Sequence, residues 1–256
     1  MVVSVEISGL PEKRLRRLVD LGFYSSVAEA VRDAVKLLFE KVNLRDAALN
    51  LYTSRDVSLS YAAEISGEPL ESFIDYMVSR GVAPALGALT LEDVGVLEGE
   101  VLLDPSSAFV VYRSLLYNVA LKLSGEGLKL YAPRALAPQI HIWEAMRVRR
   151  GLPAGGSINY ITIEPVESED SPLLTGLERG VLEYASRSGL TLLSDDYRVR
   201  LAAGAFGVRA LSSLSLIATA ASSGGVGGLG ELILSLKAIP ALIPPELEDR
   251  WLKGVW

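Results

Sequence analysis

The sequence predicts an α/β protein whose C-terminal part is a parallel sheet flanked by helices. Two short apolar runs, residues 101–103 and 190–193, have no polar face, as expected of strands that are buried on both sides. The first run ends at Asp104, the second stops at Ser194, Asp195 and Asp196, and each is followed by a segment with helical spacing. Because strands that alternate with helices imply right-handed crossovers, we expect these strands to lie parallel in one sheet.

The first 48 residues are expected to form one strand followed by two helices. Apolar and polar residues alternate over residues 3–7, and Pro11 and Gly22 are placed to begin and end the first helix. A lone strand followed by two helices cannot satisfy its own edge. Pairing with the same strand of a second chain is therefore expected.

The stretch GFYSSVAEAVRDAV, residues 22–35, resembles the ribbon-helix-helix family. The resemblance implies a homodimer that places its paired strands in the major groove of DNA. It also implies nucleic-acid contacts from Ser4 and Glu6 on the strand and from Ser25 and Ser26 at the start of the second helix. Charges in residues 1–46 nearly cancel, whereas DNA affinity depends on neutralising phosphates. The sequence thus favours dimerisation over DNA binding.

Residues 49–97 are expected to form a small helical domain. Two short helices, at 58–66 and 70–81, are predicted on either side of Gly67-Glu68-Pro69. The sequence VSLSYAAEISGEPLESFIDYMVSRGV resembles a helix-turn-helix-like antitoxin domain, and the alternative is a helical hairpin that only packs on its neighbours. Pro84 and several glycines in residues 81–100 predict a domain boundary or linker there.

Residues 98–256 form the predicted α/β domain. A helix is expected from residue 105 to about 124, followed by a strand at 128–131 and a helix after Pro133. Residues 158–163 alternate as a strand, and residues 173–188 are helical and lead into the strand at 191. A last short strand is expected within residues 206–211.

Both buried strands end in carboxylates, Asp104 after the first and Asp195 and Asp196 after the second. The carboxyl ends of parallel strands share one edge, where open α/β sheets bind their ligands. Hard oxygen ligands at that edge suit Mg²⁺ or Mn²⁺. The competing interpretation is helix capping, with Arg198 and Arg200 balancing the charge.

The segments LYAPRALAPQI and LLSDDYRVRLA, in this order after a strand that ends on Asp104, resemble the PIN domain of toxin ribonucleases. The resemblance implies that acids at the sheet edge hold divalent ions, which activate water against an RNA phosphodiester. It assigns catalytic roles to Asp104, Asp195 and Asp196, and metal binding to Asp104 and Asp195. Two further acidic positions of the family fall on Gln139 and Val181. We therefore expect Mg²⁺ or Mn²⁺ to be held weakly.

Composition excludes several classes of site. The net charge of −6 gives no global basic field, the absence of cysteine excludes disulfides and thiolate sites, and the single histidine makes a zinc site or a Ser-His-Asp triad improbable. One glutamine, four asparagines and no cysteine are typical of proteins adapted to heat. The apolar stretch at 214–221 is too short to span a bilayer and no signal-peptide pattern is present, so a cytoplasmic protein is expected.

These resemblances together predict an archaeal-type fusion of antitoxin-like and toxin-like modules. Its PIN-like domain is expected to be degenerate, with weak or no nuclease activity, and to serve nucleic-acid binding or regulation. The alternatives are an active Mg²⁺-dependent ribonuclease regulated by its fused N-terminal half, and a DNA-binding autoregulator. The expected partners are a second copy through the N-terminal strand, DNA for the N-terminal domain and RNA for the PIN-like domain, with no membrane.

Overall fold

The computed structural model describes residues 6–54, 57–156, 158–167, 173–224 and 227–255. The chain divides into two compact units, Met1–Ala47 and Ala48–Trp256. Among the described residues, no helix is long and apolar enough to cross a membrane.

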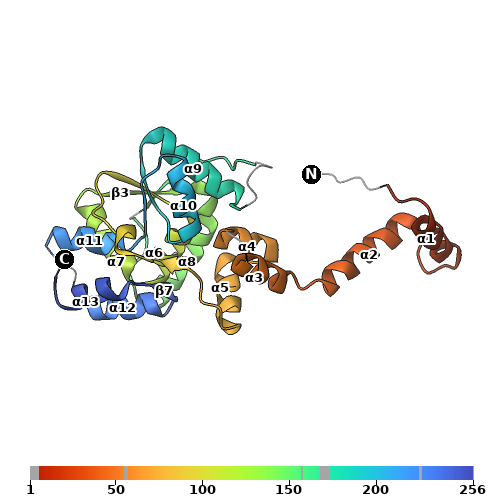
Figure 1. Cartoon of the computed structure of the whole chain (residues 1–256), viewed down its shortest axis with the longest axis horizontal. Helices are drawn as coiled ribbons and strands as arrows, with labels where there is room; N and C mark the ends of the chain where they lie inside the picture. The colour runs from red at the N-terminus through yellow and green to blue at the C-terminus, as the bar shows by residue number, and fades with distance from the viewer. Residues whose placement is uncertain (1–5, 55–56, 157, 168–172, 225–226, 256) are drawn as a thin grey trace. The chain divides into compact units, whose positions relative to one another are not determined.

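The second unit is built around a five-stranded sheet in which every pairing is parallel (Figure 1). Its strands are β2 (Glu100–Leu103), β3 (Lys129–Pro133), β4 (Ile158–Ile161), β5 (Thr191–Leu193) and β6 (Ala210–Leu211). Their order is β4-β3-β2-β5-β6, so the chain winds outward from β2 in one direction and then returns to wind in the other. The switch point, where such sheets bind ligands, lies between the carboxyl ends of β2 and β5. The prediction of an α/β fold with a parallel sheet is confirmed.

Helices cover both faces of this sheet (Figure 1). They are α6 (Pro105–Arg113), α7 (Leu116–Gly125), α8 (Ala137–Arg149), α9 (Gly176–Ser188), α10 (Tyr197–Ala205) and α11 (Ser215–Ser222). Leu102 and Leu192 pack with apolar residues of α9 and α10, whereas Leu103 and Leu193 pack with those of α6, α7, α8 and α11. Successive strand residues therefore enter opposite cores, which explains why β2 and β5 carry no polar face.

The single helix expected from residue 105 to about 124 is instead two helices, α6 and α7. The break is at Ser114, whose backbone is extended (φ −116°, ψ −179°). The Ser114 hydroxyl donates to the carbonyl oxygen of Val110 at 2.8 Å and accepts from the amide of Leu116 at 3.1 Å. The buried guanidinium of Arg147 donates to the Ser114 carbonyl oxygen at 2.7 Å. These contacts satisfy the groups that the break releases.

Residues 48–97 lie within the second unit and share its core. They form most of α3 (Leu44–Ser54), and all of α4 (Leu59–Ser66) and α5 (Leu70–Ser79). Leu59, Phe73 and Met77 are at most 1% exposed and belong to the same apolar cluster as Leu103 and Leu193.

The linker expected over residues 81–100 is instead a structured part of the second unit. Its strand β1 (Leu86–Gly87) pairs in parallel with β7 (Ala241–Leu242), close to the two C-terminal helices α12 (Leu229–Lys237) and α13 (Pro245–Leu252). A short 3₁₀ turn, η1 (Leu91–Asp93), follows β1, and the side chains of Leu86 and Leu97 are buried. Pro84 and the glycines that predicted a boundary or linker therefore lie within a packed segment.

The first unit contains α1 (Leu10–Asp20) and α2 (Val27–Lys41). The Ser26 hydroxyl caps α2 by accepting from the amide of Glu29. The two predicted helices are therefore present. The strand predicted at residues 3–7 falls mainly on residues 1–5, outside the described chain, so the ribbon remains a prediction.

Candidate functional site

Four carboxylates meet at the carboxyl edge of the sheet, and we call them the acid cluster. They are Asp104, Glu178, Asp195 and Asp196, and each is at most 1% exposed. Asp104 ends β2 and caps α6, Asp195 and Asp196 follow β5, and Glu178 lies in the first turn of α9. The sequence prediction that three of these acids share one edge agrees with this arrangement.

Asp104 accepts hydrogen bonds on both carboxylate oxygens. The amide of Ser107 and the hydroxyl of Ser106 each lie 2.8 Å from its Oδ1, and the hydroxyls of Ser194 and Ser106 lie 2.6 and 2.9 Å from its Oδ2. Asp104 is therefore both a helix cap and the centre of a serine network.

Ser106 joins the two strand ends. Besides donating to Asp104, its hydroxyl oxygen accepts from the backbone amides of Asp195 and Asp196, at 2.9 and 3.0 Å. The position of the turn after β5 thus depends on one side chain that follows β2.

Ser106→Ala is expected to destabilise the protein by about 2–4 kcal/mol, because two buried amides lose their acceptor and Asp104 loses a donor. The measurement is the midpoint of urea unfolding. Ser79→Ala is the control, since the exposed Ser79 hydroxyl bonds only within its own helix, and its effect should stay within about 0.5 kcal/mol. A Ser106→Ala midpoint equal to that of the control would contradict the assignment.

Asp195 and Asp196 have different surroundings. Asp195 Oδ1 accepts from the hydroxyl of Ser212 at 2.7 Å and the amide of Ser213 at 3.0 Å. Asp196 caps α10 through the amide of Arg198 at 2.8 Å, and its Oδ2 accepts from the amide of Leu59 at 2.5 Å. Asp196 is therefore both a helix cap and a member of the acid cluster, so the two interpretations of these acids are compatible at this residue.

Glu178 is the residue that sequence reasoning missed. Its Oε2 accepts from the amide and hydroxyl of Thr175, at 2.9 and 3.2 Å, which closes a capping box at the start of α9. The same oxygen accepts from the hydroxyl of Ser58 at 2.6 Å. The spacing Thr175-x-x-Glu178 is typical of a helix start. The sequence therefore did not indicate that Glu178 belongs to a cluster of acids. Val181, the position matched to an acid of the PIN family, lies in the apolar core.

Burial raises the pKa of every member of the acid cluster. Desolvation, together with the charge of nearby Asp196, raises the pKa of Glu178 from 4.5 to about 8. Desolvation also raises the pKa of Asp195 and of Asp196 from 3.8 to about 6, against the hydrogen bonds that lower it. The pKa of Asp104 is raised for the same reason. Each of these carboxyl groups therefore keeps its proton to a higher pH than it would in water.

The acid cluster has the oxygen donors that Mg²⁺ and Mn²⁺ prefer, but its arrangement does not fit a bound ion. Within the described chain, no three acidic or histidine side chains are placed to hold a metal. Most of the carboxylate oxygens already accept hydrogen bonds from serine hydroxyls or backbone amides. Glu178 Oε1 and Asp195 Oδ2 are the two buried cluster oxygens that have no hydrogen-bond partner among the described residues.

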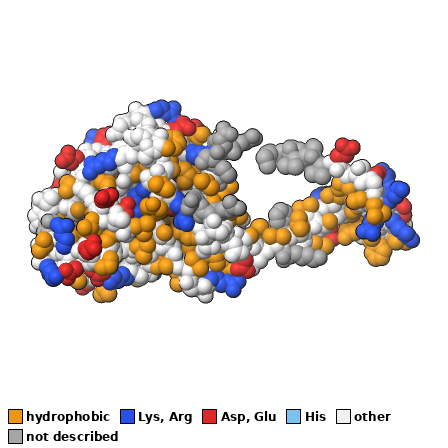
Figure 2. Space-filling model, viewed as in Figure 1, with side chains coloured by type: hydrophobic (Ala, Val, Ile, Leu, Met, Phe, Trp, Pro, Cys, Tyr) orange, Lys and Arg blue, Asp and Glu red, His pale blue; other side chains and the backbone are white. Residues whose placement is uncertain are grey.

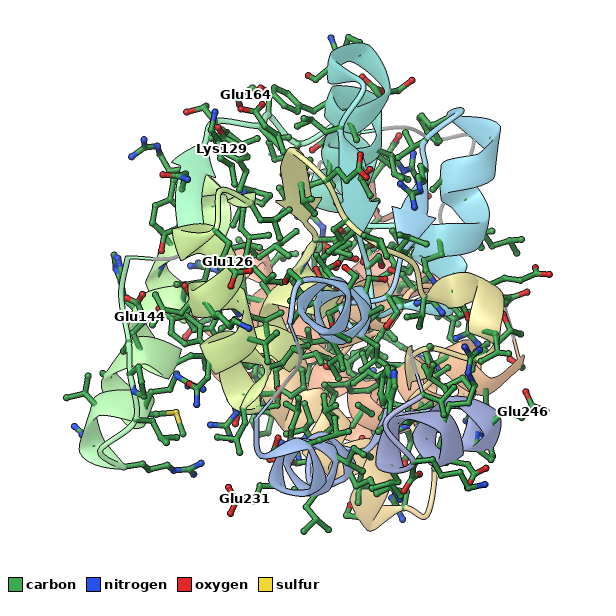
Figure 3. The ribbon with its side chains drawn as sticks, turned by 90° about the vertical axis from the view of Figure 1, so that its left-hand side faces the viewer. Glu126, Lys129, Glu144, Glu164, Glu231 and Glu246 are labelled. Atoms are coloured by element: carbon green, nitrogen blue, oxygen red, sulfur yellow. The ribbon has the colours of Figure 1, made fainter. Side chains whose placement is uncertain are left out.

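Other acids do not complete the cluster. Glu144 belongs to α8, and its carboxylate accepts from the hydroxyl of Tyr112 at 3.5 Å (Figure 3). Gln139 lines a small pocket of about 220 Å³ beside Pro105, and Glu64 and Glu68 line the same pocket. The position matched to a second acid of the PIN family is therefore near the sheet edge, but it is neutral.

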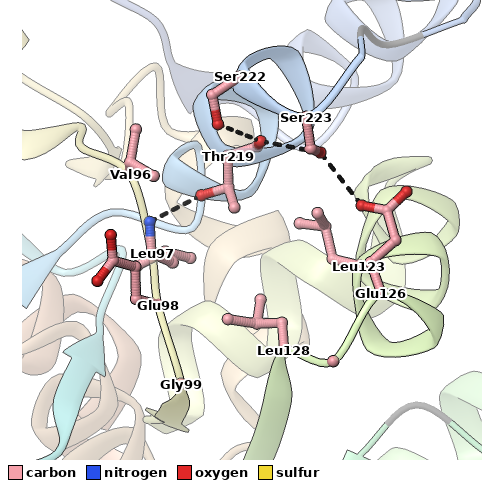
Figure 4. Close-up of a pocket in the computed structure, with 11 residues that line it drawn as sticks. Val96, Leu97, Glu98, Gly99, Leu123, Glu126, Leu128, Thr219, Ser222 and Ser223 are labelled. Carbon is pink, nitrogen blue, oxygen red and sulfur yellow. Dashed lines mark hydrogen bonds between the residues drawn. The ribbon is translucent and has the colours of Figure 1, made fainter.

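A larger pocket of about 370 Å³ lies near the opposite ends of the strands (Figure 4). Gly99 and Leu128, which precede β2 and β3, line it together with Thr219 and Glu126. Thr219 Oγ1 accepts from the backbone amide of Leu97 at 2.9 Å. No member of the acid cluster is among its lining residues.

The predicted nucleic-acid contacts of the first unit are only partly described. Ser4 lies outside the described residues, and Glu6 is exposed. The amide and hydroxyl of Ser25 both donate to Glu29 Oε2, at 2.7 and 2.5 Å, and Ser26 caps α2. An acidic side chain thus lies beside the serines that the ribbon-helix-helix resemblance assigned to DNA.

Comparison with protein-family models, with curated proteins and with solved structures gives no match to this chain.

Proposed function

We propose that this protein is a PIN-like regulatory protein of the toxin–antitoxin type whose acid cluster is closed, leaving weak or no ribonuclease activity. One observation carries the proposal. All four carboxylates are at most 1% exposed, and the N-terminus of α4 donates hydrogen bonds to two of them.

The PIN-like part of the proposal is supported by where the acids lie. Asp104 and Asp196 follow neighbouring parallel strands at the switch point, and Glu178 supplies a third carboxylate from the helix that precedes β5. A cluster of carboxylates in this place has no role in the apolar packing of the sheet. Its ordinary use in α/β proteins is ligand binding.

The expected lack of ribonuclease activity is supported by the burial of the carboxylates and by the negative charge of a nearby pocket. Water and a phosphodiester must reach the carboxylates before any hydrolysis, and burial prevents this. The pocket beside Pro105 is small, and Glu64 and Glu68 line it. Two acidic residues in the lining of this pocket disfavour the approach of an RNA backbone to it.

The test is cleavage of a mixed set of labelled RNAs by the full chain in Mn²⁺, beside Asp104→Asn. We expect no difference between the two proteins above background. Cleavage by the wild type that disappears in Asp104→Asn would contradict the proposal and establish the alternative, an active metal-dependent ribonuclease.

A second proposed function, dimerisation through the first unit, is supported by its exposed apolar surface (Figure 2). Among the residues of this unit whose exposure is described, Ala30 is the only buried hydrophobic side chain. Large hydrophobic side chains exposed there are Leu10, Leu18, Leu21, Phe23, Val35, Leu37, Leu38 and Val42. A unit with so little core of its own is stabilised by covering this surface, and a second copy supplies a matching one.

The oligomeric state tests this second proposal. We expect the full chain to sediment as a dimer at micromolar concentration and Leu38→Glu to shift it toward monomer, because a charge would be buried in the interface. Lys36→Glu, another exposed position of α2, is the control and should remain dimeric. A monomeric wild type would contradict dimerisation and the ribbon-helix-helix arrangement that needs it.

A further inference from the structure

A pocket of about 480 Å³ lies between the segment of residues 91–96 and the C-terminal helix α13, with α11 as a further wall. Most of the side chains that line it are apolar, among them Leu91, Val94 and Leu247. No member of the acid cluster is among its lining residues. Small organic ligands typically occupy pockets of roughly 300–1,000 Å³ with a mainly apolar lining and a few polar groups. The pocket has the size and the lining of such a site.

The walls of this pocket are held in place by contacts of their own. The amide of Gly95 donates to the hydroxyl of Ser215 at 3.2 Å, and the amide of Leu97 donates to the hydroxyl of Thr219 at 2.9 Å. On the opposite wall, the side chain of Trp251 is 2% exposed and packs in the main apolar cluster. Because both walls are fixed by the fold, a ligand would bind with little reordering of the chain.

The mouth of the pocket leaves apolar surface in contact with water. Leu91, Val96 and Val255 are 38%, 45% and 52% exposed, and all three line the same hollow. Single exposed hydrophobic side chains are ordinary in proteins, whereas several around one pocket mark a binding surface. The apolar body of a ligand would cover these side chains, and removing their surface from water would favour binding.

Arg250 is the one charged residue in the lining of this pocket. Two lysines of the same C-terminal part are already paired, Lys237 with Glu248 at 2.6 Å and Lys253 with Asp249 at 2.5 Å. In contrast, no ion pair or hydrogen bond joins the exposed Arg250 guanidinium to another residue of the described chain. Unlike the pockets beside Gly99 and Pro105, this pocket has no acidic residue in its lining. Its charge therefore favours an anionic ligand.

We propose that this pocket binds a small organic carboxylate with an aliphatic body, of the kind represented by a medium-chain fatty acid. The branched aliphatic side chains of the lining contact the body of the ligand. The planar guanidinium of Arg250 donates two parallel hydrogen bonds to the carboxylate, a geometry that a lysine ammonium cannot supply. The inference goes beyond the proposed function, because the pocket shares no residue with the acid cluster or with the first unit.

Two kinds of variant separate the charged and the apolar parts of the site. Arg250→Gln removes the positive charge, and Lys253→Gln is its matched control, because Lys253 ends the same helix but does not line the pocket. Ala218→Phe fills the pocket from the α11 wall. If Ala218→Phe does not fold, Val96→Gln introduces a polar side chain at an exposed position of the opposite wall.

The experiment is a titration of the full-length protein, labelled with 5-fluorotryptophan, with octanoate and with octanol at about pH 7.5, where octanoate is ionised. Binding is followed by fluorine NMR, and the Trp251 signal is assigned with Trp251→Phe. Trp251 lines the pocket, whereas Trp143 is buried in α8, so the two signals separate binding in the pocket from unspecific association. Octanol has the same apolar body as octanoate but no negative charge.

We expect octanoate to shift the Trp251 signal saturably and to bind about fivefold more tightly than octanol, as an accessible ion pair allows. Arg250→Gln should lose this preference and Lys253→Gln should keep it. Ala218→Phe should weaken the binding of both ligands by about tenfold or more, because the space for the apolar body is filled.

A Trp251 signal that does not respond to octanoate would overturn the site. A response that Ala218→Phe and Val96→Gln leave unchanged would place the ligand elsewhere and would overturn it as well. Equal affinity of the wild type for octanoate and octanol, or equal behaviour of Arg250→Gln and Lys253→Gln, would overturn the recognition of the carboxylate by Arg250.

Discussion

Raising the pH from about 5 to about 9 is expected to destabilise the protein by an amount on the order of several kcal/mol. The pKa of Glu178 is raised to about 8 in the folded protein, and the pKa values of Asp195 and Asp196 are raised to about 6. The folded state therefore keeps these protons at a pH where the unfolded chain has released them. The stability that they contribute is complete below about pH 4 and is lost as the pH rises through the folded-state values.

The measurement is urea unfolding across this pH range at constant ionic strength. Surface ion pairs contribute little to the free energy of unfolding and are screened by salt. They therefore do not reverse the loss of stability with rising pH. A stability that is constant or increases from about pH 5 to about pH 9 would contradict the assignment of buried carboxyl groups with raised pKa values.

Glu178→Gln is expected to raise the melting temperature at about pH 9 by roughly 5–10 °C. The amide keeps an oxygen that can accept from Ser58 and Thr175, as Glu178 does, but it has no charge to bury. At about pH 5 the wild-type carboxyl is already protonated, so there the substitution should give little or no gain. Sites that bind ligands commonly gain stability when a buried charge is removed.

Glu183→Gln is the matched control for this prediction. Glu183 lies in the same helix but is partly exposed, and it pairs with Arg187 at 3.1 Å. Its substitution should change the melting temperature by less than about 2 °C at either pH. If Glu178→Gln behaves like this control at about pH 9, the charge of Glu178 is not buried as we describe.

The five strands of the main sheet and three members of the acid cluster could be predicted from the sequence because their signals are local, whereas β1 and β7 were not predicted. Leu102 and Leu192 lie in apolar runs whose central residues are buried, and acids follow these runs directly at Asp104 and after one serine at Asp195. Parallel pairing then brings Asp104 and Asp196 to one edge without any further information.

Glu178 and the break at Ser114 could not be predicted, because each depends on a distant part of the chain. The carboxylate of Glu178 is buried against Ser58, which is separated from it by 120 residues. The extended backbone at Ser114 is held by Arg147, 33 residues away. Local patterns identify the capping box at Glu178 and the helical spacing around Ser114. They do not identify Ser58 or Arg147, the distant residues that contact them.

The closure of the acid cluster by α4 could not be predicted either, because it also depends on a distant part of the chain. Ser58 begins α4 as an ordinary capping residue, and the spacing of α4 and α5 predicts only a helical hairpin. Whether such a hairpin covers a site depends on where it packs. Phe73 and Met77 of α5 pack in the same apolar cluster as Leu103 and Leu193 of the sheet. This packing places the N-terminus of α4 beside the acids.

The most direct test of the account is hydrogen exchange at the backbone amide of Leu59 in the full-length protein. If Asp196 accepts from this amide in a closed, buried cluster, exchange should be slow and comparable to that of amides in the central strands β2 and β5. Exchange as fast as that of an uncapped, solvent-exposed helix start would mean that α4 does not hold the acids, and the closed site that we describe would be wrong.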